Sequence, residues 1–263
     1  MKLSKQKETM GGVCGPSRFT SNGIRISLPA AVTITSWIII VGFMLSILCA
    51  VLINFEDTTE THCHVANFLP SFSAAIATAP SSYIWRLTVT LSSTQRVTAV
   101  FGHYSLFSSL PDSTGLYKFL CRFCAALEMT ENLALIGLTC VSSRELYEIH
   151  EIFFITFQAS SMFYMMFMCL LFRLATNLGP SPTKEERHIL YKKLALFFTN
   201  LVAFISALYF FFRHNWYCEP GVYSLFALCE YLVVITNIIF HIVVSSYFED
   251  RELRLGCRIN SKK

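Results

Sequence analysis

The stretch IFFITFQASSMFYMMFMCLLF, residues 152–172, contains no charged side chain. A helix needs about 20 such residues to cross the ~30 Å hydrocarbon core of a bilayer. The composition of the whole chain agrees with this local pattern, because 54% of its 263 residues are hydrophobic and only 14% are charged. A water-soluble domain of this composition would lack polar surface. The sequence therefore predicts an all-α, polytopic integral membrane protein.

Six segments have the length of a membrane-spanning helix. They cover roughly residues 26–54, 82–110, 116–141, 149–174, 193–212 and 222–248. The first is uncharged from Ile26 to Asn54 and is too long for the core of a cleavable signal peptide, so we interpret it as a retained signal anchor. The second is the weakest, because it contains Arg86 and Arg96, and each buried arginine costs about 2.5–3.5 kcal/mol on insertion scales.

The distribution of lysine and arginine favours six crossings over five. With six crossings and a cytosolic N-terminus, the cytosolic side receives both tails, the turn near Lys118 and the basic loop at 173–193. The opposite side keeps only Arg144 and Arg213, with Arg86 near the edge. This asymmetry is the one that the positive-inside rule requires. We therefore expect a bundle of about six transmembrane helices at 28–248, with cytosolic tails at 1–27 and 249–263.

The segment THCHVANFLPS, residues 61–71, falls on the non-cytosolic side in this topology. Of the ten cysteines, only Cys63 and Cys218 lie in loops on that side, where oxidising conditions allow a disulfide between them. Two free thiols at the interface are the alternative. Zinc requires four ligands in a tetrahedral set, and His62, Cys63 and His64 are consecutive and cannot all face one ion, so we predict no metal site.

Charged residues also fall near the middle of predicted helices, where they are costly and often functional. Two of them, three residues apart, share one helical face. Pairing between the arginine and the carboxylates would lock helices together, or would line a polar cavity that admits a lipid headgroup or a proton. His103 and His241 lie nearby and are interpreted as ordinary interface histidines. The predicted intramembrane polar network consists of Arg96, Glu128, Glu131 and Glu230.

Several motifs carry a resemblance to a known family. They are FEDTTETHCHVANFLPS at 55–71, YIWR at 83–86, ENLALIGLTCVSS at 131–143, IHE at 149–151 and FRHNWYCEPGVYSLFALCEYLVVITNIIFH at 212–241. In this order they resemble the post-GPI-attachment-to-proteins factor two family, a branch of the membrane family named for the FGF-receptor-activating protein and the damage-regulated autophagy modulator. The similarity runs from about Arg25 to Phe248. One departure is His64, which stands where the family motif usually has a small residue.

The resemblance implies a multi-pass protein of the Golgi or endoplasmic reticulum membrane that matures glycosylphosphatidylinositol (GPI) anchors. In that pathway lyso-GPI receives a saturated fatty chain at sn-2, so the implied partners are lyso-GPI, GPI-anchored proteins and other GPI-remodelling proteins. An acyl donor is implied but not identified, and no other cofactor is expected. Nucleic acid is not an expected partner, because no dense basic run is interleaved with aromatic residues.

Acyl transfer to an alcohol requires a base within about 3 Å of the hydroxyl, and histidine titrates in the appropriate range. The candidate bases in the non-cytosolic loops are His62, His150 and His214. Candidates for binding the substrate are Arg86, Arg213, Glu151 and Glu219, and Arg144 is a further cation on that side.

The sequence leaves the type of function open. It contains no G-x-S-x-G motif and no H-x-x-x-x-D motif, and the nearest approach to the latter is His214 with Glu219. An acyltransferase is therefore one hypothesis, and a non-enzymatic membrane factor that presents or retains lyso-GPI for another enzyme is the alternative. A small channel or transporter is a third, although no Gly/Pro-broken pair of short helices supports it.

Overall fold

The computed structural model describes residues 25–109, 114–177, 182–246 and 252–254. Most of the predicted N-tail and C-tail lies outside these residues. These described residues form six long helices: α1 (Leu28–Ile53), α4 (Ser81–Ser108), α5 (Gly115–Cys140), α6 (Tyr147–Asn177), α7 (Lys184–Tyr217) and α8 (Val222–Ser246). The short elements are α2 (Phe55–Thr59), α3 (Phe72–Ala75) and the antiparallel strands β1 (Arg25–Ser27) and β2 (Glu252–Arg254). The all-α prediction is confirmed, with this two-stranded pair as a minor addition.

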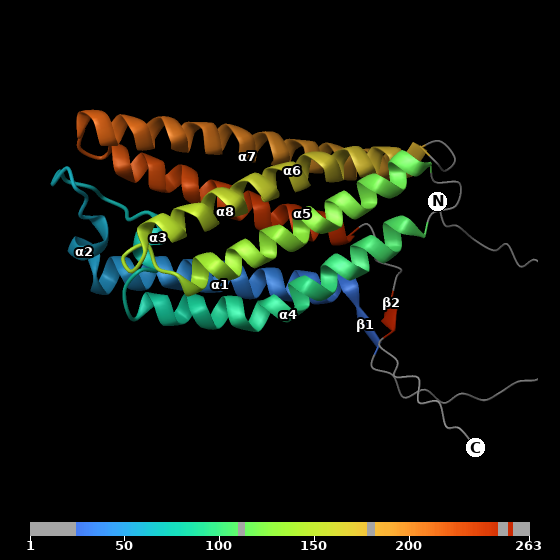
Figure 1. Ribbon diagram of the computed structural model, residues 1–263, viewed down its shortest axis with the longest axis horizontal. Coiled ribbons are helices and arrows are strands. Elements are labelled where there is room, and N and C mark those ends of the chain that lie inside the picture. Colours follow the sequence, from blue (N-terminus) through green and yellow to red (C-terminus); the bar gives the residue numbers. More distant parts are fainter. Residues whose placement is uncertain (1–24, 110–113, 178–181, 247–251, 255–263) are drawn as a thin grey trace, which may run out of the picture.

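The long helices form a ring. Each packs against the next one along the chain, and α8 packs back against α1. Consecutive helices run in opposite directions, so α1 starts and α8 ends at the same end of the bundle (Figure 1). The opposite end, which we call the α3 end, carries α2, α3 and the turns that join α5 to α6 and α7 to α8.

Five of the long helices are long and apolar enough to cross a membrane, and α4 is the exception among the described residues. It nevertheless runs beside the others for 28 residues and packs between α1 and α5. Several of its polar side chains face inward, among them Ser92 (0% exposed) and His103 (2% exposed). Gly42 of α1 permits this close approach, because a Cβ there would collide with Thr88 of α4. The prediction of about six helices is therefore confirmed.

The observed α7 is longer than the predicted segment at 193–212. Its first turn is polar but is held by a capping box, in which Thr183 Oγ1 accepts from the Glu186 N–H (3.1 Å) and Glu186 Oε2 accepts from the Thr183 N–H (2.8 Å). At the other end the helix stops at Cys218, which adopts a left-handed conformation (φ 50°). Hydropathy alone misses both ends, because neither depends on apolar side chains.

Candidate functional site

The ring of helices surrounds a cavity of about 500 Å³ next to α3, within the range of roughly 300–1,000 Å³ that is typical of ligand pockets. Its wall is largely apolar, and all six long helices contribute residues such as Ile39, Trp85, Leu135, Phe154, Phe204 and Val233. Along α8 the lining runs from Tyr223 to Ile238, a distance of about 22 Å at 1.5 Å per residue. Because half of a bilayer core measures about 15 Å, the cavity is deep enough for a long acyl chain.

A histidine and a serine meet in the wall of this cavity at its α3 end. His150, 6% exposed, has Nδ1 2.7 Å from the Val141 carbonyl oxygen and Nε2 3.1 Å from Ser73 Oγ. A carbonyl oxygen can only accept, so in the neutral ring Nδ1 carries the hydrogen. Nε2 then presents its lone pair to the Ser73 hydroxyl. This is the arrangement of a base beside an alcohol.

The other two candidate bases lie elsewhere. His62 is exposed, and its ring stacks edge-on against that of His214 with centroids 5.8 Å apart. His214 is buried (1% exposed), and its Nε2 lies 3.0 Å from Thr61 Oγ1. Neither side chain lines the large cavity. Of the three histidines, the structure therefore brings only His150 to the cavity.

A disulfide joins Cys63 to Cys218 and ties the loop between α2 and α3 to the turn between α7 and α8. It lies beside His62, and the three side chains form a cluster compact enough to approach a metal ion. Because the two sulfur atoms are bonded to each other, neither is a thiolate ligand for such an ion.

The arginines at the α3 end differ in their partners. Arg213 Nε and Nη2 donate to the two carboxylate oxygens of Glu219 at 2.7 and 2.9 Å, and this hydrogen bonding lowers the pKa of Glu219. Arg144 Nη1 lies 2.8 Å from Asp57 Oδ2. Arg86 has no acidic partner within the part of the chain that the structure describes.

Glu151 is exposed on the rim of the large cavity.

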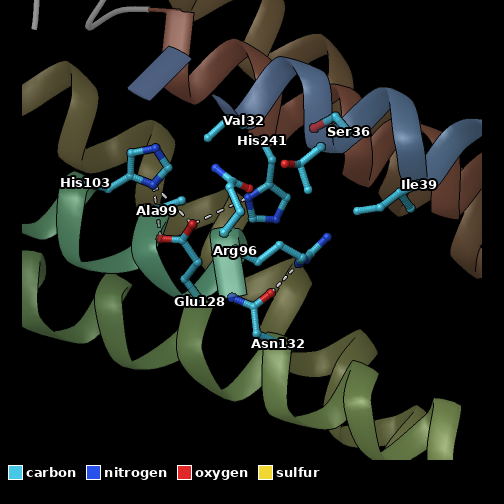
Figure 2. A pocket seen from close by; sticks show the side chains of 11 residues that line it. Val32, Ser36, Ile39, Arg96, Ala99, His103, Glu128, Asn132 and His241 are labelled. Carbon is cyan, nitrogen blue, oxygen red and sulfur yellow. Dashed lines mark hydrogen bonds and ion pairs between the residues drawn. The ribbon is translucent and has the colours of Figure 1, made fainter. Parts of the chain in front are cut away.

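A buried polar network closes the deep end of the cavity. Glu131, 0% exposed, accepts hydrogen bonds from Asn237 Nδ2 (3.0 Å) and Arg96 Nη2 (3.5 Å), and it lies 3.0 Å from His241 Nε2. Arg96 also donates to Asn132, and it lines both the large cavity and a second, small cavity of about 20 Å³ (Figure 2). The small cavity has room for about one water molecule.

Two residues of this region differ from the sequence interpretation. His103 Nδ1 lies 3.1 Å from Glu128, and His241 Nδ1 lies 3.6 Å from the same carboxylate, so both histidines belong to the network (Figure 2). A sequence signal existed, because His103 follows Arg96 by seven residues and His241 follows Asn237 by four, which places each pair on one helical face.

Glu230 is separate from the other three members of the predicted network. Its Oε2 accepts from the Phe72 N–H at 2.8 Å, at the start of α3. It therefore lies beside α3, about halfway along the part of the cavity wall that α8 provides. The predicted set of four thus divides into a deep network and a carboxylate beside α3.

Residues 27–250 match the family model described as the Frag1/DRAM/Sfk1/Cwh43P N-terminal domain. The chain belongs to this family. It is 40% identical over 215 residues to "Acyltransferase PGAP2" of Xenopus tropicalis, covering 81% of this chain and 84% of that protein. It is 39% identical over 230 residues to "Post-GPI attachment to proteins factor 2" of Caenorhabditis briggsae, covering 84% and 85%. No solved structure matches.

Membership of the Frag1/DRAM/Sfk1/Cwh43 family confirms the resemblance seen in the sequence motifs. The matched region includes all six long helices, the disulfide and both cavities. The sequence motifs of this chain include His150 but not Ser73. Ser73 is recognised only through its contact with His150, which lies 77 positions later in the chain.

Proposed function

We propose that this chain acts in GPI-anchor maturation, as a membrane enzyme that reacylates lyso-GPI at sn-2 with a saturated fatty chain. The observation that carries the proposal is the base His150 in the wall of a deep, apolar cavity. The names of the relatives, one called an acyltransferase and another a post-GPI attachment factor, support the same pathway.

In this proposal the fatty chain occupies the apolar cavity, with its carbonyl carbon at the α3 end beside His150. The sn-2 hydroxyl of lyso-GPI approaches from the same end, where its glycerol lies at the membrane interface. His150 Nε2 accepts the proton that the reaction releases, and the Val141 carbonyl keeps the ring in the correct orientation.

The headgroup of the substrate requires a cation for its phosphate. Arg86 suits this role best among the arginines of the α3 end, because Arg213 and Arg144 are already paired with carboxylates. Glu151 on the rim can accept hydrogen bonds from sugar or inositol hydroxyls. Arg213 and Glu219 then act as a pair that shapes the turn at the cavity mouth.

The orientation follows from the same chemistry. GPI anchors occupy the lumenal leaflet, so the proposal requires the α3 end to face the lumen of the Golgi or the endoplasmic reticulum. The tails would then be cytosolic, as the positive-inside rule predicts.

One assay separates an enzyme from a factor that only retains the substrate. Purified protein in nanodiscs receives lyso-GPI and phospholipid with a labelled stearoyl chain. We expect transfer by the native chain, and a decrease of about 10²–10⁴-fold for His150→Ala, which is the usual contribution of a general base. His62→Ala and His214→Ala should keep most of the activity.

His64→Asn is a matched control, because His64 lies in the same loop with its side chain 76% exposed, and asparagine tolerates its positive φ of 50°. If transfer occurs only after a second protein is added, the chain is not the enzyme but a factor that presents lyso-GPI to it.

A further inference from the structure

We propose that Ser73 is a nucleophile, and that the fatty chain passes from a phospholipid ester to lyso-GPI through an ester on Ser73. This inference rests on the proposed function and adds to it a covalent intermediate and a donor class. The motifs of nucleophilic serine enzymes are absent from the sequence around Ser73, so the inference depends on the geometry alone.

The first support is the hydrogen-bond direction between the two side chains. Because the Val141 carbonyl fixes the hydrogen on Nδ1 of His150, the Ser73 hydroxyl donates to Nε2 over 3.1 Å. A serine hydroxyl is a weak nucleophile until a neighbouring base removes its proton as it attacks. Ser73 has that base, and it lines the cavity in which the fatty chain would lie.

The second support is the way in which Ser73 is held. The preceding residue, Phe72, donates its N–H to Glu230 Oε2 at 2.8 Å. Ser71 Oγ accepts from the Ala74 N–H at 3.2 Å and from the Tyr223 hydroxyl at 2.8 Å. The N–H groups of both neighbours of Ser73, Phe72 and Ala74, are therefore held by side chains that do not themselves take part in the reaction. A reactive group must be held in this way to keep its geometry.

Further ties fix the loop that leads to Ser73. The Tyr231 hydroxyl donates to the Pro70 carbonyl at 2.6 Å, and Ser224 Oγ accepts from the Phe68 and Leu69 N–H groups at 2.8 and 3.0 Å. Residues 68–70 of the loop are thus each hydrogen-bonded to a side chain of α8. His150, in contrast, lies on α6. The contact between Ser73 and His150 joins these two parts of the site.

The two half-reactions balance without any further reactant. First, Ser73 Oγ attacks the ester carbonyl of the phospholipid and its proton passes to His150 Nε2. The bond between the carbonyl and the glycerol oxygen breaks, and that oxygen takes the proton from His150 and leaves as a lysophospholipid. Second, the sn-2 hydroxyl of lyso-GPI attacks acyl-Ser73 and gives its proton to His150. The ester bond to Ser73 breaks, and Oγ recovers the proton.

The charge of the α3 end favours a phospholipid over a coenzyme A thioester as the donor. The segments 54–86, 138–151 and 211–224, which form this end, contain seven acidic side chains and three arginines. Two of these arginines are neutralised by ion pairs, with Asp57 and Glu219. A carrier with several phosphates would be repelled by such a surface, whereas a zwitterionic phospholipid would not.

The test traps the intermediate in the full chain, purified in nanodiscs. The native chain and three variants receive phosphatidylcholine with a labelled stearoyl chain and no acceptor, and peptide mass spectrometry locates the label after denaturation. We expect stearoyl on Ser73 in the native chain and none in Ser73→Ala. In Ser73→Cys we expect a thioester that neutral hydroxylamine removes, which would identify the position even if the alanine variant folded poorly.

Ser93→Ala is the matched control. Ser93 lies on α4 outside the cavity lining, and its hydroxyl donates to the Val89 carbonyl of its own helix at 2.6 Å. The Ser93→Ala variant should carry the stearoyl label on Ser73 and should transfer the fatty chain to lyso-GPI at the native rate. Ser73→Ala should transfer at least about a hundredfold more slowly.

The outcomes distinguish this inference from the proposed function. Native-rate transfer to lyso-GPI by Ser73→Ala, with no label on the native protein, would refute the covalent intermediate and leave the enzyme standing. Label on Ser73 that never reaches lyso-GPI would refute the proposed acceptor and support the nucleophile. Labelling by stearoyl-coenzyme A and not by phosphatidylcholine would overturn the donor class.

Discussion

The depth of the cavity predicts a change in chain-length preference for Ala207→Leu. Ala207 lies on α7, ten residues before its end at the α3 end, and its side chain (5% exposed) faces the cavity. At 1.5 Å per residue it lies about 15 Å from that end of the helix and about 7 Å deeper than Phe212, where the α7 part of the cavity lining begins. Leucine adds three carbon atoms at this depth. We therefore expect the variant to prefer a donor chain about three methylenes shorter than the one preferred by the native protein.

The size of the change in chain-length preference follows from the energetic cost of a cavity in a protein interior. Leu→Ala substitutions in protein interiors cost about 2.7–5 kcal/mol, and part of that cost is transfer from water. A lipid chain comes from the bilayer and not from water, so we take a smaller value of about 2 kcal/mol. Since 1.4 kcal/mol corresponds to a tenfold change, the ratio of stearoyl transfer to transfer of the shorter chain should fall by about thirtyfold.

A competition assay measures this ratio directly. Equal amounts of two phospholipids, with labelled stearoyl and with a chain three methylenes shorter, are given to the same nanodisc sample with lyso-GPI. Val202→Leu is the control, because Val202 is 62% exposed on the outer face of α7, and its ratio should equal that of the native protein. An unchanged ratio in Ala207→Leu with normal total activity would show that the fatty chain does not occupy this cavity.

Three further predictions concern the parts that support the site. Cys63→Ser removes the disulfide, and we expect a lower melting temperature than that of the native protein and at least a tenfold loss of transfer, with dithiothreitol producing the same changes in the native protein. Arg96→Gln and Glu131→Gln should each lower stability because each removes one side of a buried ion pair, but by less than the roughly 3–5 kcal/mol of an uncompensated charge, since Glu131 keeps Asn237 and His241 and Arg96 keeps Asn132. A double-mutant cycle should show a coupling above about 0.5 kcal/mol, whereas additive effects would contradict the pairing. Arg213 holds Glu219 in its charged form and lowers its pKa. The stability that this ion pair contributes is therefore fully present above the unfolded-state pKa and is lost as the pH falls through the lowered value. An acid titration of the Arg213 Nε–H resonance should show that transition, and Glu219→Gln should abolish it.

The long helices could be predicted from the sequence because the thickness of a bilayer fixes their length. The α4 helix required a different argument, since it is not apolar enough to be recognised as a membrane-spanning helix by hydropathy. Only the distribution of basic residues indicated that it crosses. The structure supplies the reason. Arg96 is paired with Glu131 and Asn132 of α5, and a hydropathy scale assigns its cost to α4 alone without seeing these partners.

The site was less predictable because its decisive contacts are long-range or involve backbone. Three histidines predicted to lie in loops were indistinguishable as sequence. His150 differs from the other two because it lines the large cavity and because its ring lies between the Val141 carbonyl and the Ser73 hydroxyl. The four-residue helix α3 is too short to leave a periodic pattern. Its N-cap serine, Ser71, after Pro70 was the available signal, and it gives no indication that the next serine faces a histidine.

Glu230 shows why a carboxylate within an apolar helix cannot be assigned from its position alone. It lies about 12 Å along α8 from the start of that helix, at 1.5 Å per residue, and its side chain is buried. The loop that carries α3 enters the bundle there, and irregular backbone is tolerated inside a membrane protein only where its N–H groups find acceptors. The Phe72 N–H finds one in Glu230, so a single pairing satisfies two groups that would each be costly alone. Because this pairing fixes the residue before Ser73, the carboxylate positions the reactive serine, whereas the deep carboxylates Glu128 and Glu131 hold the helices together.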